Sequence, residues 1–599
     1  MKVAVWRFPD FMIRWTFLLL ALIFFAIEAR PFGLENYDGF ELLVASLTAS
    51  PAHSPGYSVY LFCIRIFSEI LGFFGIELAL ATVFFNFVCF LFLVILLKRM
   101  TRRFDFDPFF IAFSLLCFPP LFQNMLQVEV YVFDLLLMIA TLSLYFEHKD
   151  RSLLFFLVAG LWVSHRSVAI LPLLPFLIVR FSELKGLQKS FSLFILLFPI
   201  LQLLWLAYGL QSSSYGWLWP ASSQPGLSGA WAHFSGSMYS GSLAMNLPGL
   251  RKLAQMWFSL GIVLGLMSSL LIFLPRHRRW KPFLFAFCLS LAFPLFYQVP
   301  DLEVFLIVPF CLLILCLSPS SKSTFTSVLW VLPMLLLFSL LIDEEDVHSN
   351  YFYRASEQKV KDARAIKDYG ASRDQTVVFA AYDSVFALLY INLVIAEQAV
   401  PFKVFPLWSL YDKAHFLRTK SIVNRLERDA LGLPAYSSES GVSEPALHLQ
   451  KLEELILLNQ DKELLFPGDK AQVQYLLRES RSLHQKQIGS FCNGFWIRFA
   501  RNLPMNNPLS FIYLGPISSM QGSRVRPVVF QFAWKVDFQG YELEIQKVGS
   551  SKVLKKPVPR HFGDRLSVGL SSEFSQGDEL VVRLKRTGEN LGQSILILD

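Results

Sequence analysis

Two carboxylates and a histidine lie close together near the start of the chain, in a polar stretch that follows the first apolar run. They are Asp38, Glu41 and His53. A carboxylate at a membrane surface can act as a general base for a hydroxyl group, and partial burial raises its pKa toward the working range. The plainer alternatives are that Asp38 caps a turn or helix, that Glu41 is solvated and that His53 orders its loop.

Two arginines are candidates for binding phosphate, because a guanidinium group binds phosphate oxygens in pairs. Arg65 has a competing partner in Glu69, four residues later on the same helical face. Arg166 lies beside apolar runs, an expensive placement that is kept for function or for a buried ion pair. Transfer of a group from a phosphate to a hydroxyl requires a base, which takes the hydroxyl proton, and cations, which bind the leaving phosphate. One carboxylate suffices there, because the phosphate leaves without being protonated.

The composition divides the chain into two parts. Of its 599 residues only 17% are charged, against about 25% in an ordinary soluble protein. Residues 1–340 contain 22 Lys/Arg and 16 Asp/Glu, about 11%, whereas the remainder contains 32 and 30, about 24%. This excludes a purely soluble protein, a disordered chain and nucleic-acid binding as the main role. Six of the seven cysteines lie in apolar runs, which argues against a disulfide framework or a zinc site.

The first part reads as a polytopic α-helical membrane domain with about 11 transmembrane helices, each needing about 20 residues. The predicted spans are residues 13–29, 77–97, 108–123, 130–146, 152–165, 166–180, 190–209, 255–275, 283–299, 303–318 and 324–342. Alternate loops are rich in Lys and Arg, which places the N-terminus in the cytoplasm and residues 343–599 outside. Two alternatives stay open. Residues 152–180 could form one long helix broken at His165-Arg166, and the first span could pass for a signal peptide.

A short apolar helix is predicted at Tyr57–Leu71, between two points on the outer side. Its length and its single polar face favour a position in the membrane interface. Such a helix would hold Asp38, Glu41 and His53 at the boundary between water and lipid.

The same region resembles a known family of polytopic membrane glycosyltransferases. The matching stretches are Asp38-Gly39-Phe40-Glu41, His53-Ser54-Pro55-Gly56-Tyr57, Tyr60 and Arg65-Ile66-Phe67. They resemble the family's Asp-Ser-Gly-Glu-Phe, its His-Pro-Pro-Gly and its Gly-Arg-Leu-Phe helix. The acidic motif here is one residue shorter, and Ser54 replaces the first proline. The family includes the eukaryotic O-mannosyltransferase of plexin-type receptor domains and belongs to the C-type glycosyltransferases, whose donors are polyprenyl-phosphate sugars.

The resemblance continues along the chain to residue 390. Further similar stretches are Val128-Glu129-Val130-Tyr131, Ser164-His165-Arg166, the residues Trp217, His233 and Tyr239, Asp301-Leu302-Glu303-Val304-Phe305, and Val377–Tyr390. The resemblance implies that Asp38 is the catalytic base. Glu41 is the second catalytic candidate, and its role is open between supporting Asp38, supporting the acceptor and being solvated. The donor-binding candidates are His53, Tyr57, Arg65, His165 and Arg166. The candidates for the acceptor site or cavity are Glu129, Tyr131, His233, Tyr239, Asp301 and Glu303, although the acidic ones could equally be hydrated helix ends.

No ligand spacing in the sequence requires a metal, although the acidic residues could accept a divalent ion. The second part predicts an extracytoplasmic α/β domain at residues 343–505 and a β-sandwich at 506–599, after the transmembrane domain at 1–342. A strand followed by a turn into a helix is predicted at Gln375–Phe386, and strands are predicted at Val528–Val536, Tyr541–Gln546 and Glu579–Leu584. The role of this part is open between acceptor capture and a structural cap.

The sequence therefore favours a membrane glycosyltransferase that moves a mannose-like hexose from a polyprenyl phosphate to a hydroxyl acceptor, with protein Ser/Thr as one candidate. Its expected partners are the lipid bilayer, the donor lipid and a protein or glycan acceptor, and its expected location is a bacterial inner membrane. A lipid or solute transporter would instead place ionisable residues at mid-membrane and show paired broken helices. A non-catalytic scaffold would leave Asp38 dispensable.

Overall fold

The structure is a computed structural model whose residues separate into two compact units, Met1–Glu357 and Gln358–Asp599. In the first unit it describes residues 12–20, 37–101, 106–147, 152–213, 215–236, 280–296 and 302–317. In the second unit it describes residues 376–380, 382–394, 403–406, 463–467, 487–491, 496–499, 512–514, 526–532, 541–547, 550–557, 565–570, 579–586 and 589–597.

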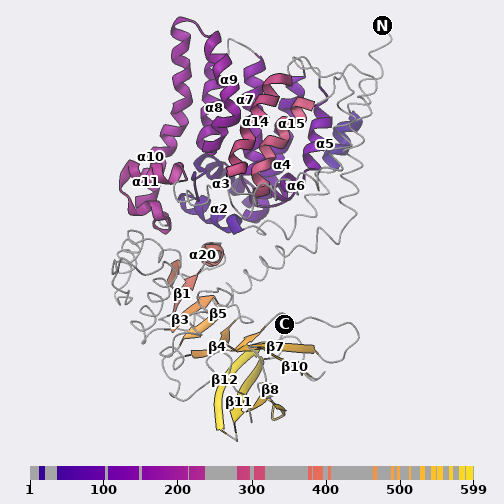
Figure 1. Cartoon of the computed structure of the whole chain (residues 1–599), viewed down its shortest axis with the longest axis vertical. Helices are drawn as coiled ribbons and strands as arrows, with labels where there is room; N and C mark the ends of the chain where they lie inside the picture. The colour runs from indigo at the N-terminus through magenta and orange to yellow at the C-terminus, as the bar shows by residue number, and fades with distance from the viewer. Residues whose placement is uncertain are drawn as a thin grey trace. The chain divides into compact units, whose positions relative to one another are not determined.

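The described part of the first unit is helical, and its apolar helices lie side by side (Figure 1). Its main helices are α2 (Tyr37–Thr48), α3 (Ser58–Gly72), α4 (Leu78–Met100), α5 (Pro108–Leu116), α6 (Pro119–Leu126), α7 (Tyr131–Glu147), α8 (Ser152–His165), α9 (Ile170–Glu183), α10 (Leu197–Ser212), α11 (Gly226–Phe234), α14 (Trp280–Phe296) and α15 (Ile307–Leu317). Helix α7 packs between α4 and α8, and α14 packs against α9 and α15.

Two described helices are long and apolar enough to cross a membrane, Leu78–Met100 and Gln188–Ser212. A third candidate is formed by α5 and α6 together, which are bent by 80°. Four further apolar helices are shorter, within Tyr131–Phe146, Ser152–His165, Lys281–Pro294 and Val304–Cys316. The predicted spans 255–275 and 324–342 lie outside the described residues, so the count of 11 stays a prediction.

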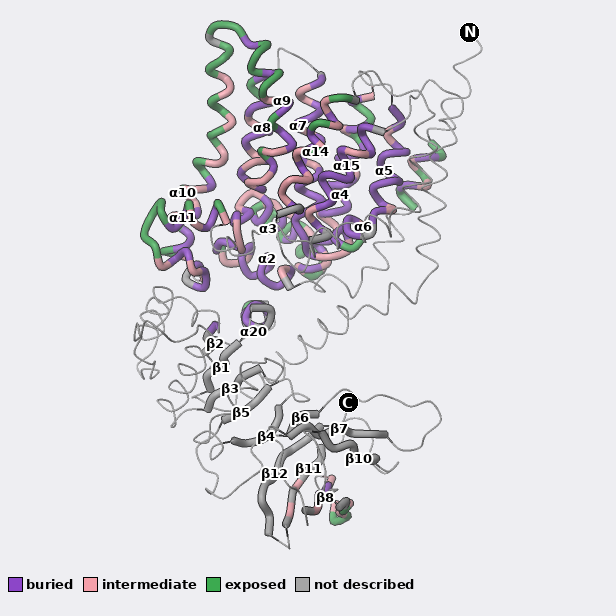
Figure 2. Tube along the Cα trace, viewed as in Figure 1, coloured by how far each residue is buried: buried purple, intermediate pink, exposed green. Residues whose placement is uncertain are grey.

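The outer surface of α10 and of the segment before it is apolar and exposed. Leu193, Ile200, Leu204 and Tyr208 are each about half exposed or more, and Figure 2 shows exposed and half-buried residues along this helix. A water-soluble protein rarely presents so continuous an apolar surface. The surface therefore suits contact with lipid.

The predicted interfacial helix is confirmed as a helix by α3. Helix α8 ends at His165, where the predicted spans 152–165 and 166–180 meet; this end fits both two spans and one broken helix. Along α3, Phe62, Ile66 and Ile70 recur every four residues and are exposed, while Tyr60 and Ile64 are buried. Four-residue spacing places the exposed residues on one helical face. After α8, a short 3-10 helix at Ser167–Ala169 precedes α9.

The start of α5 ties the amino-terminal helical residues to the rest of the unit. Asp107 caps α5 by accepting hydrogen bonds from the backbone N–H groups of Phe109 and Phe110. Its other carboxylate oxygen lies 2.5 Å from Nη1 of Arg14, and both side chains are buried. Trp15 packs edge-on against Phe109.

The described residues of the second unit form three sheets. The first has the order β2-β1-β3-β5-β4, with β1 (Thr376–Ala380) parallel to β2 (Lys403–Pro406) and β3 (Glu463–Pro467), and β5 (Trp496–Phe499) antiparallel to β3 and β4 (Gln487–Phe491). Helix α20 (Tyr382–Val394) follows β1, which confirms the predicted strand–turn–helix.

The other two sheets are antiparallel and have the orders β10-β7-β6 and β12-β11-β8-β9. Their strands are β6 (Ile512–Leu514), β7 (Arg526–Phe532), β8 (Tyr541–Lys547), β9 (Val553–Pro557), β10 (Arg565–Leu570), β11 (Glu579–Arg586) and β12 (Glu589–Ile597). The predicted strands near 528, 541 and 579 are thus confirmed as β7, β8 and β11. The packing of the sheets into a sandwich and the domain limits at 343 and 506 stay predictions.

Candidate active site

Helix α2 presents Asp38 and Glu41 on one face, because residues three apart on a helix are neighbours. Asp38 lies in the first turn, where the helix dipole favours a negative charge. Its side chain is 26% exposed, whereas that of Glu41 is completely buried. The two carboxylates thus differ in access: Asp38 can meet a ligand, and Glu41 cannot reach solvent.

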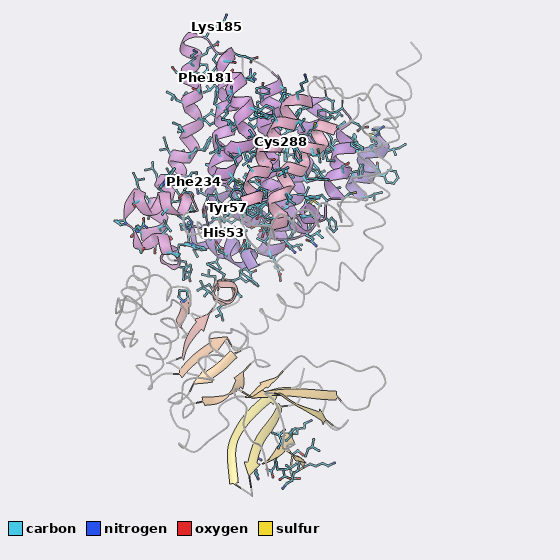
Figure 3. All side chains as sticks on the ribbon, in the orientation of Figure 1. His53, Tyr57, Phe181, Lys185, Phe234 and Cys288 are labelled. Carbon is cyan, nitrogen blue, oxygen red and sulfur yellow. The ribbon has the colours of Figure 1, made fainter. Side chains whose placement is uncertain are left out.

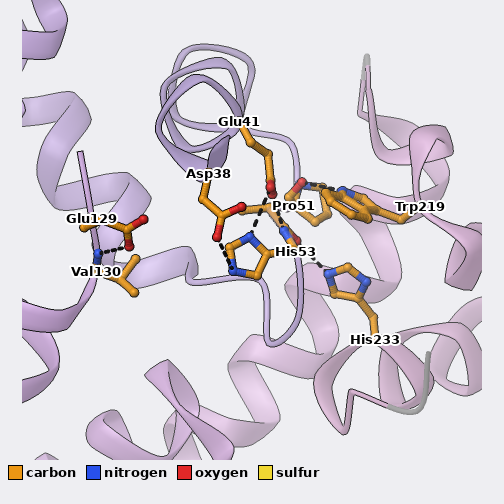
Figure 4. Close-up of polar contacts among 9 residues, drawn as sticks. Asp38, Glu41, Pro51, His53, Glu129, Val130, Trp219 and His233 are labelled. Atoms are coloured by element: carbon orange, nitrogen blue, oxygen red, sulfur yellow. Dashed lines mark hydrogen bonds and ion pairs between the residues drawn. The ribbon is translucent and has the colours of Figure 1, made fainter. Parts of the chain in front are cut away.

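His53 lies between the two carboxylates (Figure 4). Its Nδ1 lies 3.0 Å from Oε2 of Glu41, and its Nε2 lies 3.6 Å from Oδ2 of Asp38. The backbone N–H of His53 also donates to Oε1 of Glu41. Glu41 therefore fixes both the backbone and the ring of His53, and the ring's other nitrogen faces Asp38.

The charges in this cluster depend on one another. Burial lowers the pKa of His53, but the carboxylates of Asp38 and Glu41 outweigh burial and raise this pKa to about 10. Burial raises the pKa of Glu41 to about 7, against the opposing effect of His53. At neutral pH His53 is therefore an imidazolium ion that pairs with the accessible Asp38 carboxylate.

A second layer of aromatic and acidic side chains adjoins the cluster. The ring of Tyr57 lies 5.1 Å from that of His53 and 5.2 Å from that of His165, measured between centroids; Figure 3 labels His53 and Tyr57. Glu129 is buried, and its carboxylate accepts a hydrogen bond from the backbone N–H of Val130. The backbone carbonyl of Glu129 accepts a hydrogen bond from the Tyr60 hydroxyl. The structure therefore brings Asp38, Glu41, His53, Tyr57 and His165 into one neighbourhood.

The two arginines have different environments. Arg65 is on the exposed side of α3 and pairs with Glu69, with Nε 2.9 Å from Oε1. Arg166 is buried and pairs with Asp134 at 2.6 Å, and Asp134 also accepts a hydrogen bond from Trp162. Both arginines thus have carboxylate partners.

The guanidinium group of Arg166 also stacks over two aromatic rings. Its Cζ lies 5.2 Å from the centroid of Tyr131 and 4.8 Å from that of Phe305. Arg166, Asp134 and Trp162 line one pocket. The sequence interpretation missed Asp134, although it is the one acidic residue within the apolar run 130–146 and therefore needed a partner.

The remaining candidates are described only in part. His233 is buried on α11, and its Nε2 donates to the carbonyl oxygen of Ala52 at 2.7 Å. Glu303 belongs to the 3-10 helix Leu302–Leu306, but its side chain lies outside the description. Tyr239 and Asp301 lie outside the described residues.

No family model matches this chain, and no curated protein matches it. The chain is similar to a solved structure, ArnT from Cupriavidus metallidurans bound to undecaprenyl phosphate. The TM-score is 0.42 and the sequence identity is 10%, over 82% of this chain and 98% of that one.

Asp38, Glu41 and His53 also form a candidate ligand set for a metal ion. One ligand atom from each lies within 4.8 Å of the others. A carboxylate–imidazole set suits a divalent transition metal. A metal needs the neutral imidazole, however, so protonation of His53 competes with metal binding. Binding of a metal ion by all three residues would therefore release the proton of His53.

The geometry gives Asp38 the properties of a general base. The accessible Asp38 carboxylate faces the ring of His53, and that ring is itself held by buried Glu41. The three groups lie in a row: the accessible carboxylate of Asp38, the imidazolium of His53 and the buried carboxylate of Glu41, which orients the ring. Such a set can take a proton from a hydroxyl group while the positive ring offsets negative charge on a neighbouring ligand.

Proposed function

We propose that this protein is a membrane glycosyltransferase that uses a polyprenyl-phosphate sugar, with Asp38 as the base. The observation that carries the proposal is the chain of contacts from buried Glu41 through His53 to the accessible Asp38. The lipid-suited surface of α10 and the sequence resemblance around these residues support a lipid-linked donor. The proposed sugar is a mannose-like hexose, and the proposed acceptor is a hydroxyl group on the extracytoplasmic face, with protein Ser/Thr as one candidate.

In the proposed reaction, the acceptor oxygen attacks the anomeric carbon of the sugar. A new C–O bond forms there as the bond from that carbon to the phosphate oxygen breaks. The electron pair of the broken bond leaves on the polyprenyl phosphate, and the acceptor proton goes to Asp38. The imidazolium of His53 stays protonated and offsets the developing negative charge.

We assign the phosphate side to His53 and Arg65, with Arg166 in a supporting part. Arg65 is exposed on α3 and can exchange Glu69 for a phosphate at the lipid surface. Arg166 keeps its buried partner Asp134, so we assign it to shaping the aromatic cavity. Glu129 and Tyr131 are assigned to the wall of the acceptor side.

The test is sugar transfer from radiolabelled polyprenyl-phosphate donors by the purified full-length protein, with cell extract as the source of acceptor. Asp38→Asn should lower turnover by about 10²- to 10⁴-fold, the usual contribution of a general base, with donor binding retained. Glu77→Gln, an acid-to-amide change at an exposed position before α4, serves as the control.

Equal turnover in wild type and Asp38→Asn would remove Asp38 from the reaction. No transfer from any donor, by wild-type protein that binds none of them, would favour the transporter or scaffold alternatives.

A further inference from the structure

The loop that carries His53 is held by side chains 147 to 181 residues further along the chain. Between α2 and α3, the loop has a single backbone turn at its tip, in which Gly56 N–H donates to the His53 carbonyl. The carbonyl groups on either side of this tip accept hydrogen bonds from outside the loop. The loop's conformation is therefore set by the segment of α10 and α11.

Three buried donors supply these hydrogen bonds. Trp219 Nε1 donates to Pro51 O at 2.8 Å, and His233 Nε2 donates to Ala52 O at 2.7 Å. Gln202 Nε2 donates to Pro55 O at 2.7 Å, and its Oε1 accepts from the Ser58 hydroxyl. Pro51 and Ala52 immediately precede His53. A shift of either carbonyl therefore moves the imidazole relative to Asp38.

The donors also contact one another and the loop tip closely. The rings of Trp219 and His233 lie 5.6 Å apart at an interplanar angle of 62°. At Gly56, a Cβ atom would lie 2.7 Å from Leu206 and 2.9 Å from Gln202. The loop thus has no room to move toward α10.

His233 is suited to act as a constant donor. Burial lowers the pKa of His233 to about 4, which keeps its ring neutral at physiological pH. A neutral imidazole has one N–H, and the contact with Ala52 O places it on Nε2. Buried Nδ1 has no hydrogen-bond partner among the residues that the structure describes. His233 therefore keeps an N–H directed at the Ala52 carbonyl at physiological pH.

We propose that His233, Trp219 and Gln202 are positioning residues that hold the His53 loop so that the ring faces both Asp38 and Glu41. The expected effect on turnover rests on the proposed function. The positioning of His53 by these residues does not depend on it. If a donor is lost, the loop relaxes and His53 moves away from the two carboxylates. Both the turnover and the proton affinity of His53 should then change.

The proton affinity of His53 gives a measurement that is independent of sugar transfer. Diethyl pyrocarbonate reacts with the unprotonated imidazole, so the pH dependence of labelling of the His53 peptide, read by mass spectrometry, gives its midpoint. The variants are His233→Leu, which removes the donor, and His233→Gln, whose amide can restore an N–H. Trp231→Leu, an exposed position on the same helix, is the control.

His233→Leu should lower the His53 midpoint by about 1 pH unit, a tenfold change in proton affinity. It should also lower kcat about 10- to 100-fold with the donor KM unchanged, the effect of a small misplacement. His233→Gln should restore both. Should His233→Leu fail to fold, Trp219→Phe removes a donor while keeping an aromatic ring and is read in the same way.

An unchanged midpoint in a folded variant, with only a lower unfolding temperature, would overturn the proposal and leave these residues a merely structural role. If wild-type protein transfers no sugar from any donor, the proposed function fails. The labelling midpoint still decides the positioning role in that case.

Discussion

Glu41 holds His53 at two points, through its backbone N–H and through Nδ1 of its ring. A buried carboxylate is costly unless its oxygens are satisfied, and here the same residue satisfies both. The contact fixes the ring orientation as well as the loop position. Glu41 is therefore an orienting group for His53, and its removal should change the position of the His53 ring relative to Asp38.

Glu41→Ala should destabilise the protein by about 1–3 kcal/mol, because it leaves buried donors of His53 unsatisfied. Glu41→Gln keeps an acceptor and should cost less, but it removes a negative charge and so lowers the pKa of His53 from about 10. Thermal unfolding in detergent gives the first effect, with Glu77→Ala as the exposed control. Equal losses in Glu41→Ala and Glu77→Ala would contradict the orienting role.

The stability of the protein should fall as the pH rises. The pKa of His53 is raised from 6.5 to about 10, so its contribution is complete below pH 6.5 and disappears as pH approaches 10. The pKa of Glu41 is raised from 4.5 to about 7, so the folded state binds that proton more tightly and loses stability over this interval. Both effects have the same sign.

We therefore expect the unfolding temperature to drop between pH 6.5 and pH 10, and to drop less in His53→Gln. A slope that is the same in the variant as in wild type would show that His53 is not the group responsible.

Gly56→Ala and Gly75→Ala form a matched pair. Both glycines have positive φ, 97° and 76°, so alanine strains the backbone at each. A Cβ at Gly75 meets nothing within 4 Å, whereas at Gly56 it collides with Leu206 and Gln202. Gly56→Ala should cost about 1–3 kcal/mol more than Gly75→Ala, because only it overpacks the interior. Unfolding temperatures of the two variants that agree would rule out a close approach of the loop to α10.

The pair of Arg166 and Asp134 should show strong coupling. Removing either partner leaves the other charge buried, which costs about 3–5 kcal/mol. Replacing both, in Arg166→Leu with Asp134→Leu, should cost less than the sum of the single changes. Unfolding measurements on the four proteins of the cycle give the coupling free energy. Additive losses would mean that the two charges do not form a buried pair.

Arg65 should act on donor affinity without acting on stability. Its pair with Glu69 is exposed, and exposed pairs contribute about 0–1 kcal/mol. Arg65→Gln should raise the donor KM, whereas Glu69→Gln should lower it by removing the competing carboxylate. Steady-state kinetics with the radiolabelled donor give both values. Changes of the same sign in the two variants would remove Arg65 from the phosphate side.

Local patterns in the sequence were sufficient to predict α3, β1 with α20, β7, β8 and β11. These elements follow from spacing over a few residues. The loop motif similarly indicated Asp38, Glu41 and His53 as neighbours, because only 14 residues lie between Asp38 and His53.

The residues that hold the His53 loop and the partner of Arg166 could not be predicted from local sequence patterns. Gln202 is one amide in an apolar run, which indicates that it needs a partner but not that the partner is Pro55. From the sequence alone, Trp219 is most plainly an aromatic anchor at the membrane interface, and His233 is a candidate for the acceptor site or cavity. Likewise, the sequence around Arg166 indicated either a functional charge or a buried ion pair. The ion pair could not be predicted because its partner, Asp134, lies on another helix.

The contact between Arg14 and Asp107 has a consequence for maturation of the protein. Proteolytic removal of residues 1–29, at the site that resembles a signal-peptidase motif, would take away the guanidinium group that neutralises Asp107. The carboxylate would then remain buried at the start of α5, with its charge uncompensated by Arg14. The amino-terminal helical residues 12–20 are therefore part of the architecture. A fusion that exchanges them should retain an arginine at the same helical position.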